Sequence, residues 1–185
     1  MTARLRLLCH GATAATRSGS FASDEPIEDR ERVRISLLAS QMPRFDLILT
    51  SPARRALETA AALGLTAEVE PALRDADFGR WRGRSLAQVF EEEPEAASLW
   101  SSEPQIAPHE GESISAVIER VGGWMDGLRP AGRTLAVTHA AVIRAAAVHV
   151  LKAPAASFWA IDVAPLAHVD FTHDGRRWRL RAAKH

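Results

Sequence analysis

Two histidines stand where an apolar run gives way to a helical pattern, and imidazoles at such places can act as nucleophiles or proton carriers. His10 follows the apolar run Leu5–Cys9, and His139 follows the run Arg133–Thr138. Both runs have the length and composition of buried strands. In an open α/β sheet, ligands bind at the carboxyl edge of the strands. We therefore predict that both histidines lie at one edge of a sheet.

A third segment of the same kind brings positive charge to that edge. The run Phe45–Thr50 is typical of a buried strand, and Ser51 is a suitable N-cap for a helix predicted over 53–63. Either Arg54 or Arg55, in the first turn of that helix, could reach the same crevice. Guanidinium groups and the free N–H groups of helix N-termini both favour an anion. Together with two imidazoles, they suit a phosphomonoester dianion.

The rest of the chain alternates between helical and strand patterns. Helical patterns cover 28–41, 113–128 and 140–151, a strand pattern covers 67–73, and an Asp-Gly turn joins a hairpin of 168–172 and 177–182. This order predicts a three-layer α/β/α fold, with a mostly parallel central sheet and an antiparallel edge. The stretch of about 75–111, rich in Trp, Pro and Glu, is predicted to form a small lid insertion within a single domain of residues 1–185.

Bulk composition excludes several classes of protein. The 185 residues include 23 Lys+Arg and 23 Asp+Glu, so the formal charge is zero and neither nucleic acid nor a membrane is an expected partner. The single cysteine, Cys9, cannot form an intrachain disulfide, which favours a cytoplasmic location. No pair among His149, His168 and His173 has metal-ligand spacing, so we expect neither a metal nor another cofactor. The oligomeric state stays open.

Five motifs occur in order along the chain. They are Leu-Leu-Cys-His-Gly-Ala-Thr (7–13), Ser-Pro-Ala-Arg-Arg-Ala-Leu-Glu-Thr-Ala (51–60), Leu-Arg-Asp-Ala-Asp-Phe-Gly-Arg-Trp-Arg-Gly (73–83), Gly-Glu-Ser (111–113) and Val-Thr-His-Ala-Ala-Val-Ile-Arg (137–144). Each is weak alone, but the ordered set resembles the histidine phosphatase superfamily, which includes the cofactor-dependent phosphoglycerate mutases. The resemblance covers most of the chain, from Leu7 to about Ala147.

The resemblance implies a role for each candidate residue. It makes His10 the nucleophile that becomes phosphorylated, and His139 the second imidazole, which stabilises the phosphoryl group in the transition state. It makes Arg55 a phosphate ligand. It places Asp75 where many members carry a glutamate that protonates the leaving oxygen, with Asp77 as a rival for that role. Phosphate contacts are also implied for Gly11, Thr13 and Ala140.

The implied activity is a metal-independent phosphomonoesterase reaction through a phosphohistidine intermediate. The substrate class is a small phosphorylated metabolite, with α-ribazole phosphate or a sugar or nucleotide phosphate as candidates. A lid of about 35 residues favours a small molecule that must be enclosed. Three alternatives stay open: a weakened or inactive phosphate-binding member of the family, a phosphohistidine protein phosphatase, and a mutase.

The chain departs from the family pattern next to the nucleophile. Cys9 stands where the family usually has an arginine, which removes a charge-assisted contact worth roughly 1.5–3 kcal/mol. Arg17, Arg80 and Arg82 are candidates to replace it. A cysteine-dependent phosphatase would need an arginine six residues after the cysteine, where this chain has Ala15. We therefore interpret Cys9 as a buried strand residue.

Overall fold

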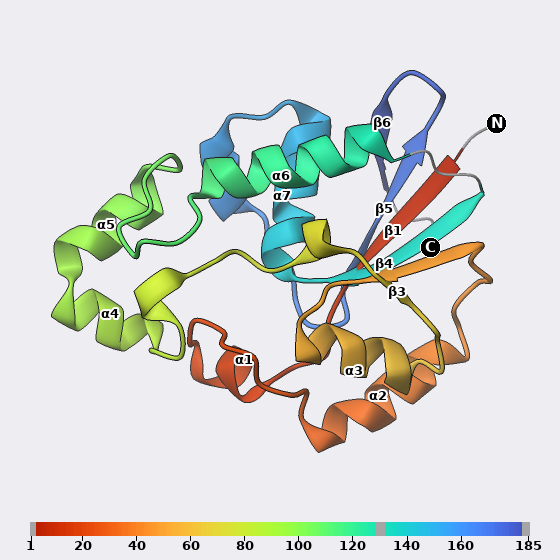
Figure 1. Ribbon diagram of the computed structural model, residues 1–185, viewed down its shortest axis with the longest axis horizontal. Helices are drawn as coiled ribbons and strands as arrows, with labels where there is room; N and C mark the ends of the chain where they lie inside the picture. Colours follow the sequence, from red (N-terminus) through yellow and green to blue (C-terminus); the bar gives the residue numbers. More distant parts are fainter. Residues whose placement is uncertain (1–2, 129–131, 183–185) are drawn as a thin grey trace.

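The computed structural model describes residues 3–128 and 132–182, in which a six-stranded sheet lies between two layers of helices (Figure 1). The strands are β1 (Ala3–Cys9), β2 (Leu47–Thr50), β3 (Glu68–Val69), β4 (Arg133–Thr138), β5 (His168–His173) and β6 (Trp178–Arg181). Their order is β3-β2-β4-β1-β5-β6. The first four in this order are parallel, and β5 and β6 add an antiparallel edge, so the predicted sheet is confirmed.

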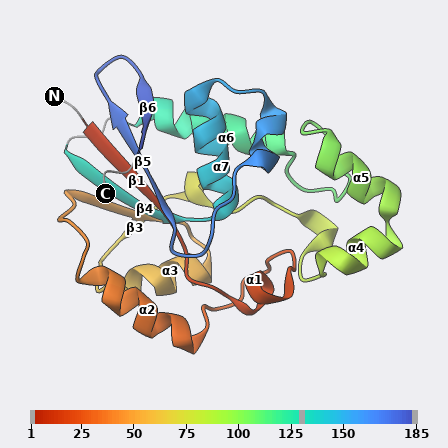
Figure 2. The same cartoon turned by 180° about the vertical axis from the view of Figure 1, so that it is seen from behind.

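Helices cover both faces of the sheet (Figure 2). One face carries α2 (Asp29–Ala39) and α3 (Arg54–Ala62), and the other carries α6 (Ile114–Gly127) and α7 (Ala140–Leu151). Side chains of β1 alternate between them: Leu7 and Cys9 pack in the cluster with α6 and α7, whereas Leu8 packs in the cluster with α2 and α3. The three-layer prediction is therefore confirmed. No helix within the described ranges is both long enough and apolar enough to cross a bilayer.

Strand register brings the two histidines together. Cys9 of β1 lies opposite Thr138 of β4, so the next residue of each strand is a histidine at the same edge. The His10 N–H donates to the Thr138 carbonyl at 2.9 Å. On the other side of β4, the Ser51 N–H donates to the Val137 carbonyl at 2.9 Å. Three loops, each after a parallel strand, thus meet at one point.

Two local predictions are wrong. The strand expected over 67–73 is only the two residues of β3, because Pro71 cannot donate to a ladder and begins a short 3₁₀ helix, η1 (Pro71–Leu73). Ser51 does not cap α3, whose N-cap is Ala53. The Ser51 hydroxyl lies 2.7 Å from His139 Nε2 and accepts from the Ala53 N–H at 3.2 Å.

The predicted lid region contains a 3₁₀ helix, η2 (Gly79–Trp81), and the helices α4 (Leu86–Glu92) and α5 (Pro94–Ser102). It has an aromatic core of its own, also joined by the loop that follows α1 (Ala14–Ser18) and by η3 (Ala155–Ala160). This core comprises Phe21, Trp81, Val89, Ala97 and Trp100, with Phe78, Ala96 and Trp159 packed against it. Trp81 is fully buried in this cluster, as expected for a packing residue.

Two glycines allow the ends of the lid to approach each other. A Cβ on Gly79 would lie 2.0 Å from the His109 carbonyl oxygen, and one on Gly111 would lie 2.0 Å from the Asp77 carbonyl oxygen. The Asp77 carbonyl accepts from the Glu112 N–H at 2.7 Å. The segment that carries Asp77 is therefore fixed to the segment that follows the lid.

We expect Gly79→Ala to lower the free energy of unfolding by about 3 kcal/mol, because it combines a positive φ with a backbone overlap. Gly64→Ala is the matched control. Gly64 also has a positive φ, but its Cβ would meet nothing within 4 Å, so about 1 kcal/mol is expected. Urea unfolding of both variants measures the difference, and equal losses would contradict this account of the lid base.

Candidate active site

His10 is a buried, neutral imidazole whose Nε2 carries a lone pair and no hydrogen. Its Nδ1 lies 2.7 Å from the Gly11 carbonyl, which can only accept, so Nδ1 carries the hydrogen. Its Nε2 accepts from Arg55 Nε at 3.2 Å, and an arginine can only donate. Burial lowers the pKa of His10 below its usual 6.5, and the Arg55 charge lowers it further. The ring is therefore unprotonated at neutral pH.

Arg55 connects the residues of the site. It is 2% exposed and uses all three guanidinium nitrogens: Nε on His10, Nη1 on the Ser23 carbonyl at 3.1 Å, and Nη2 on Asp75 Oδ2 at 2.6 Å. Arg54 is exposed instead. The sequence left open whether Arg54 or Arg55 reaches the histidines. In the structure Arg55 lies beside His10, and Arg54 lies on the surface.

His139 lies edge-on to His10, with the ring centroids 5.1 Å apart. Its Nε2 is 2.7 Å from Ser51 Oγ, and its Nδ1 is 3.4 Å from Asp75 Oδ2. A carboxylate beside Nδ1 favours the tautomer with hydrogen on Nδ1, in which Nε2 accepts from the Ser51 hydroxyl. Burial lowers the pKa of His139 to about 3. His139 therefore offers a neutral N–H donor to the middle of the site.

Asp75 completes the cluster, and Asp77 does not belong to it. One oxygen of Asp75 faces both Arg55 and His139. Burial would raise the pKa of Asp75, but the His139 imidazole and the Arg55 guanidinium lower it below its usual value. Asp77 pairs with Arg82 at 3.0 Å and is more exposed. Of the two rival carboxylates, the one in contact with the histidine pair is Asp75.

Gly11 and Thr13 use their hydrogen-bond donors within the protein. The Gly11 N–H donates to Thr59 Oγ1 at 3.0 Å, while the Gly11 carbonyl holds His10. The Thr13 hydroxyl donates to Glu25 Oε1 at 3.0 Å, and Thr13 is the N-cap of α1. In this arrangement both residues orient the loop that carries His10.

Cys9 is buried in the core cluster beside α7 and has no opening to solvent. Burial, and then the charge of Asp75, raise the pKa of the Cys9 thiol to about 12. The Ala140 N–H at the start of α7 hydrogen-bonds to this sulfur. The three arginines considered as replacements pair with other carboxylates: Arg17 with Glu28, Arg80 with Glu93 and Arg82 with Asp77.

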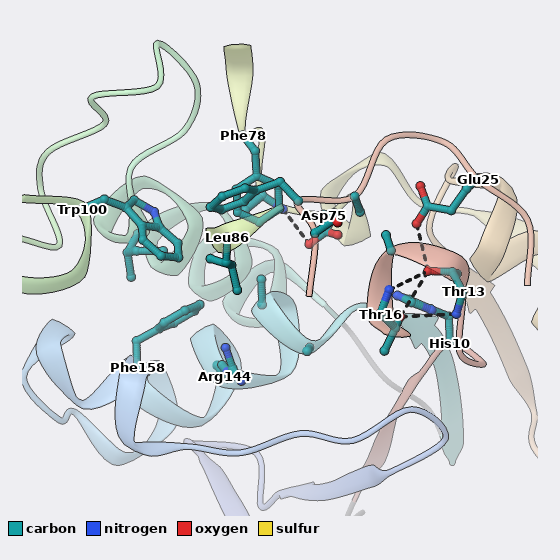
Figure 3. A pocket seen from close by; sticks show the side chains of 18 of the residues that line it. His10, Thr13, Thr16, Glu25, Asp75, Phe78, Leu86, Trp100, Arg144 and Phe158 are labelled. Atoms are coloured by element: carbon teal, nitrogen blue, oxygen red, sulfur yellow. Dashed lines mark hydrogen bonds between the residues drawn. The ribbon is translucent and has the colours of Figure 1, made fainter. Parts of the chain in front are cut away.

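A cavity of about 230 Å³ opens beside the cluster (Figure 3). His10 and Thr13 lie at one end, Trp100 and Phe158 lie at the other, and Asp75 lies between them. Most of the wall is apolar. The cavity can therefore hold a phosphoryl group against His10 and a carbon skeleton against the aromatic rings.

Sequence reasoning missed three residues of this region. Ser51 hydrogen-bonds to His139, Glu25 accepts from Thr13, and Arg144 lines the cavity. Two of the three have a signal in the sequence, because Ser51 opens one motif and Arg144 closes another. Glu25 has none, since an acidic residue in a polar loop is usually solvated.

The sequence model of the histidine phosphatase superfamily (branch 1) matches residues 5–184. The match covers nearly the whole chain, and the chain belongs to this superfamily.

Individual relatives come from several bacteria. The chain is 27% identical over 186 residues to the bifunctional protein Rv2228c of Mycobacterium tuberculosis, covering 93% of this chain and 51% of that protein. Among solved structures, mycobacterial glucosyl-3-phosphoglycerate phosphatase superposes with a TM-score of 0.85 at 26% identity, covering 97% of both chains. The α-ribazole phosphatase of Shigella flexneri superposes with a TM-score of 0.82 at 26% identity, covering 96% of this chain and 94% of that one. The chain spans about half the length of the curated relatives it matches.

The buried histidines predict acid sensitivity. A histidine with a lowered folded-state pKa binds a proton more readily when unfolded, so its contribution is complete above pH 6.5 and is lost as the pH falls. As the pH falls from 6.5 to about 5, the His139 contribution to the free energy of unfolding decreases by about 2 kcal/mol. Most carboxylates titrate below this pH range. Urea unfolding at several pH values measures it. His139→Asn should flatten this dependence, and a slope equal to that of the parent would contradict the assignment.

Proposed function

We propose that this chain is a metal-independent phosphomonoesterase that transfers the phosphoryl group of a small metabolite to His10 Nε2 and then to water. The observation that carries the proposal is the contact of a neutral His10 Nε2 with the buried guanidinium of Arg55 at 3.2 Å, beside a cavity of about 230 Å³. A nucleophile, a fixed cation and a carboxyl group thus lie within one cluster. These parts meet the needs of phosphoryl transfer.

The first half-reaction forms a phosphorus–nitrogen bond. His10 Nε2 attacks the phosphorus, while the hydrogen bond from Nδ1 to the Gly11 carbonyl supports the positive charge that develops on the ring. Arg55 moves its donors from His10 and Asp75 to the phosphoryl oxygens, where charge accumulates. His139 donates from Nδ1 to another phosphoryl oxygen. The phosphorus–oxygen bond to the leaving group breaks.

Asp75 supplies the proton that the leaving oxygen needs. Its pKa is low while it pairs with Arg55, so it must take up a proton from solvent when substrate binds. A phosphate dianion brings negative charge beside Asp75 and takes over the Arg55 contact, and both effects raise the pKa of a carboxyl group. In the second half-reaction, the ionised Asp75 accepts a proton from the attacking water, the phosphorus–nitrogen bond breaks, and inorganic phosphate leaves.

Cys9 weakens this site relative to the family pattern. The resemblance predicts an arginine directly before the nucleophile, and the thiol here is neutral and packed in the core. Phosphate therefore loses one cationic contact, worth roughly 1.5–3 kcal/mol. We expect a higher KM for simple phosphate esters than a site with two guanidinium groups would give. The same residue supports a second candidate, a phosphate-binding member of the family without turnover.

The form of the cavity favours a metabolite over a protein substrate. Trp100 and Phe158 line the end opposite His10, so a phosphohistidine on a folded protein would have to enter a largely apolar pocket. The names of the relatives agree with a small substrate, since they include a glucosyl-3-phosphoglycerate phosphatase and an α-ribazole phosphatase. We propose a sugar-acid, ribazole-like or nucleotide phosphate ester as the substrate class.

The decisive experiment is turnover of 4-nitrophenyl phosphate with chelator present, combined with rapid acid or base quenching to trap the phosphoenzyme. We expect an acid-labile, base-stable phosphohistidine in the parent protein. His10→Ala should lower kcat by at least about 1,000-fold and abolish the trapped species. Trapping of phosphate on another residue would overturn the nucleophile assignment.

Cys9→Ala is the matched control, because it changes the neighbouring buried residue without touching the imidazole. It should stay within about threefold of the parent in kcat, as a neutral core thiol takes no part in the transfer. Loss of turnover in this variant alone would indicate cysteine chemistry. If the parent protein binds vanadate but hydrolyses no ester of a broad panel, the non-catalytic candidate is correct.

Ser51→Ala should lower kcat about tenfold, because His139 loses the hydroxyl that keeps its hydrogen on Nδ1. Ser51→Thr retains a hydroxyl and should recover most of the activity. Steady-state kinetics of the three proteins checks this, with thermal melting to separate a loss of folding from a loss of orientation. Equal kcat values in the parent and in the Ala variant would contradict the positioning role.

A further inference from the structure

Arg144, on α7, lines the cavity near Phe158 and apart from His10 (Figure 3). Its guanidinium carbon lies 5.6 Å from the centroid of the Phe158 ring, a cation–π contact. Its Nε is buried and has no hydrogen-bond partner. The side chain is half-buried and forms no ion pair with any described residue.

This combination separates Arg144 from the other arginines. Within residues 3–128 and 132–182, the remaining arginines that lack an ion pair are all exposed to solvent. They are Arg4, Arg44, Arg133, Arg176, Arg177 and Arg181. Water can satisfy an exposed guanidinium, but a cation between apolar walls has lost much of its hydration. Among these arginines, Arg144 is therefore the one that an anionic ligand would stabilise most.

The carboxylates of the same cavity are already engaged. Asp75 pairs with Arg55, and Glu25 accepts from Thr13 at the opposite end. At the Arg144 end, the indole N–H groups of Trp100 and Trp159 also have no acceptor. The residues that line that end therefore carry buried donors without acceptors.

The position of Arg144 sets the spacing between two anionic groups. Ala140, Ala141 and Arg144 all line the cavity from α7, and the four-residue step from Ala140 to Arg144 spans about 6 Å of helix. Long side chains on a helix lean toward its N-terminus, which here is the His139 end. The small alanines leave room for a carbon skeleton between the guanidinium and the phosphate position.

We propose that Arg144 binds a carboxylate on the organic part of the phosphomonoester, so that the preferred substrate carries its phosphate and a carboxylate about one helical turn apart. This inference rests on the proposed phosphatase function and deepens it. A carboxylate matches the single charge and the planar fork of one guanidinium, whereas a second phosphate would call for more than one cation. The surrounding aromatic rings contact the carbon skeleton of the ligand.

The test compares two esters of the same shape, 4-carboxyphenyl phosphate and 4-carbamoylphenyl phosphate, on the full chain. Arg144→Met should lower kcat/KM about tenfold or more for the carboxylate ester and less than about twofold for the amide ester. Arg144→Lys should recover part of the loss. Arg176→Met, which changes an exposed arginine without an ion pair, is the matched control and should alter neither value.

Equal losses on both esters, or no loss on either, would overturn the proposal. Vanadate inhibition adds a further check, because vanadate occupies only the phosphate position. Its inhibition constant should stay within about twofold in Arg144→Met, and a larger change would mean that Arg144 contacts the phosphoryl group itself.

Calorimetry with 4-(phosphonomethyl)benzoate and its benzamide analogue separates the failure of this inference from that of the phosphatase function. These phosphonates need no turnover to report on the subsite. Selective loss of benzoate binding in Arg144→Met, in a protein that hydrolyses no ester, would uphold the subsite and reject the enzymatic activity. Turnover without any carboxylate selectivity would uphold the phosphatase activity and reject the carboxylate subsite.

Discussion

The site depends on one buried guanidinium. Arg55 is almost inaccessible to water, and such a charge persists only if every donor finds an acceptor. Its partners are His10 Nε2, Asp75 and a backbone carbonyl, so the same contacts that stabilise the cation also fix the His10 ring and the Asp75 carboxylate. The Arg55 charge also disfavours protonation of His10, which keeps the ring nucleophilic. Replacing Asp75 by a phosphate dianion exchanges one anionic partner of Arg55 for another.

Strand register explains why distant residues could be predicted to meet. Parallel β1 and β4 end in step, and each is followed by a histidine, so the apolar runs alone indicate that His10 and His139 share an edge. The hairpin and α7 follow similarly from the turn signal and the alanine-rich helical pattern. The predicted three-layer fold needed only these periodicities and the alternation of element types.

Other features depend on contacts that no local pattern encodes. The residue type of Ser51 suits a helix cap, but the sequence gives no sign that its hydroxyl lies 2.7 Å from His139 Nε2, and the N-cap of α3 is Ala53. Which of Asp75 and Asp77 faces the histidines depends on the path of the chain into the lid, which the close approach of Gly79 to the His109 carbonyl defines.

The charges of the cavity lie in a definite order. Arg55 contacts His10, and Arg144, one helical turn along α7 from Ala140, lies beside the Phe158 ring. A second cation farther along the cavity shifts part of the binding energy from the phosphoryl group to the rest of the molecule. Since binding energy from non-reacting parts of a substrate can support the chemical step, such a site favours esters that engage both cations over simple phosphate esters.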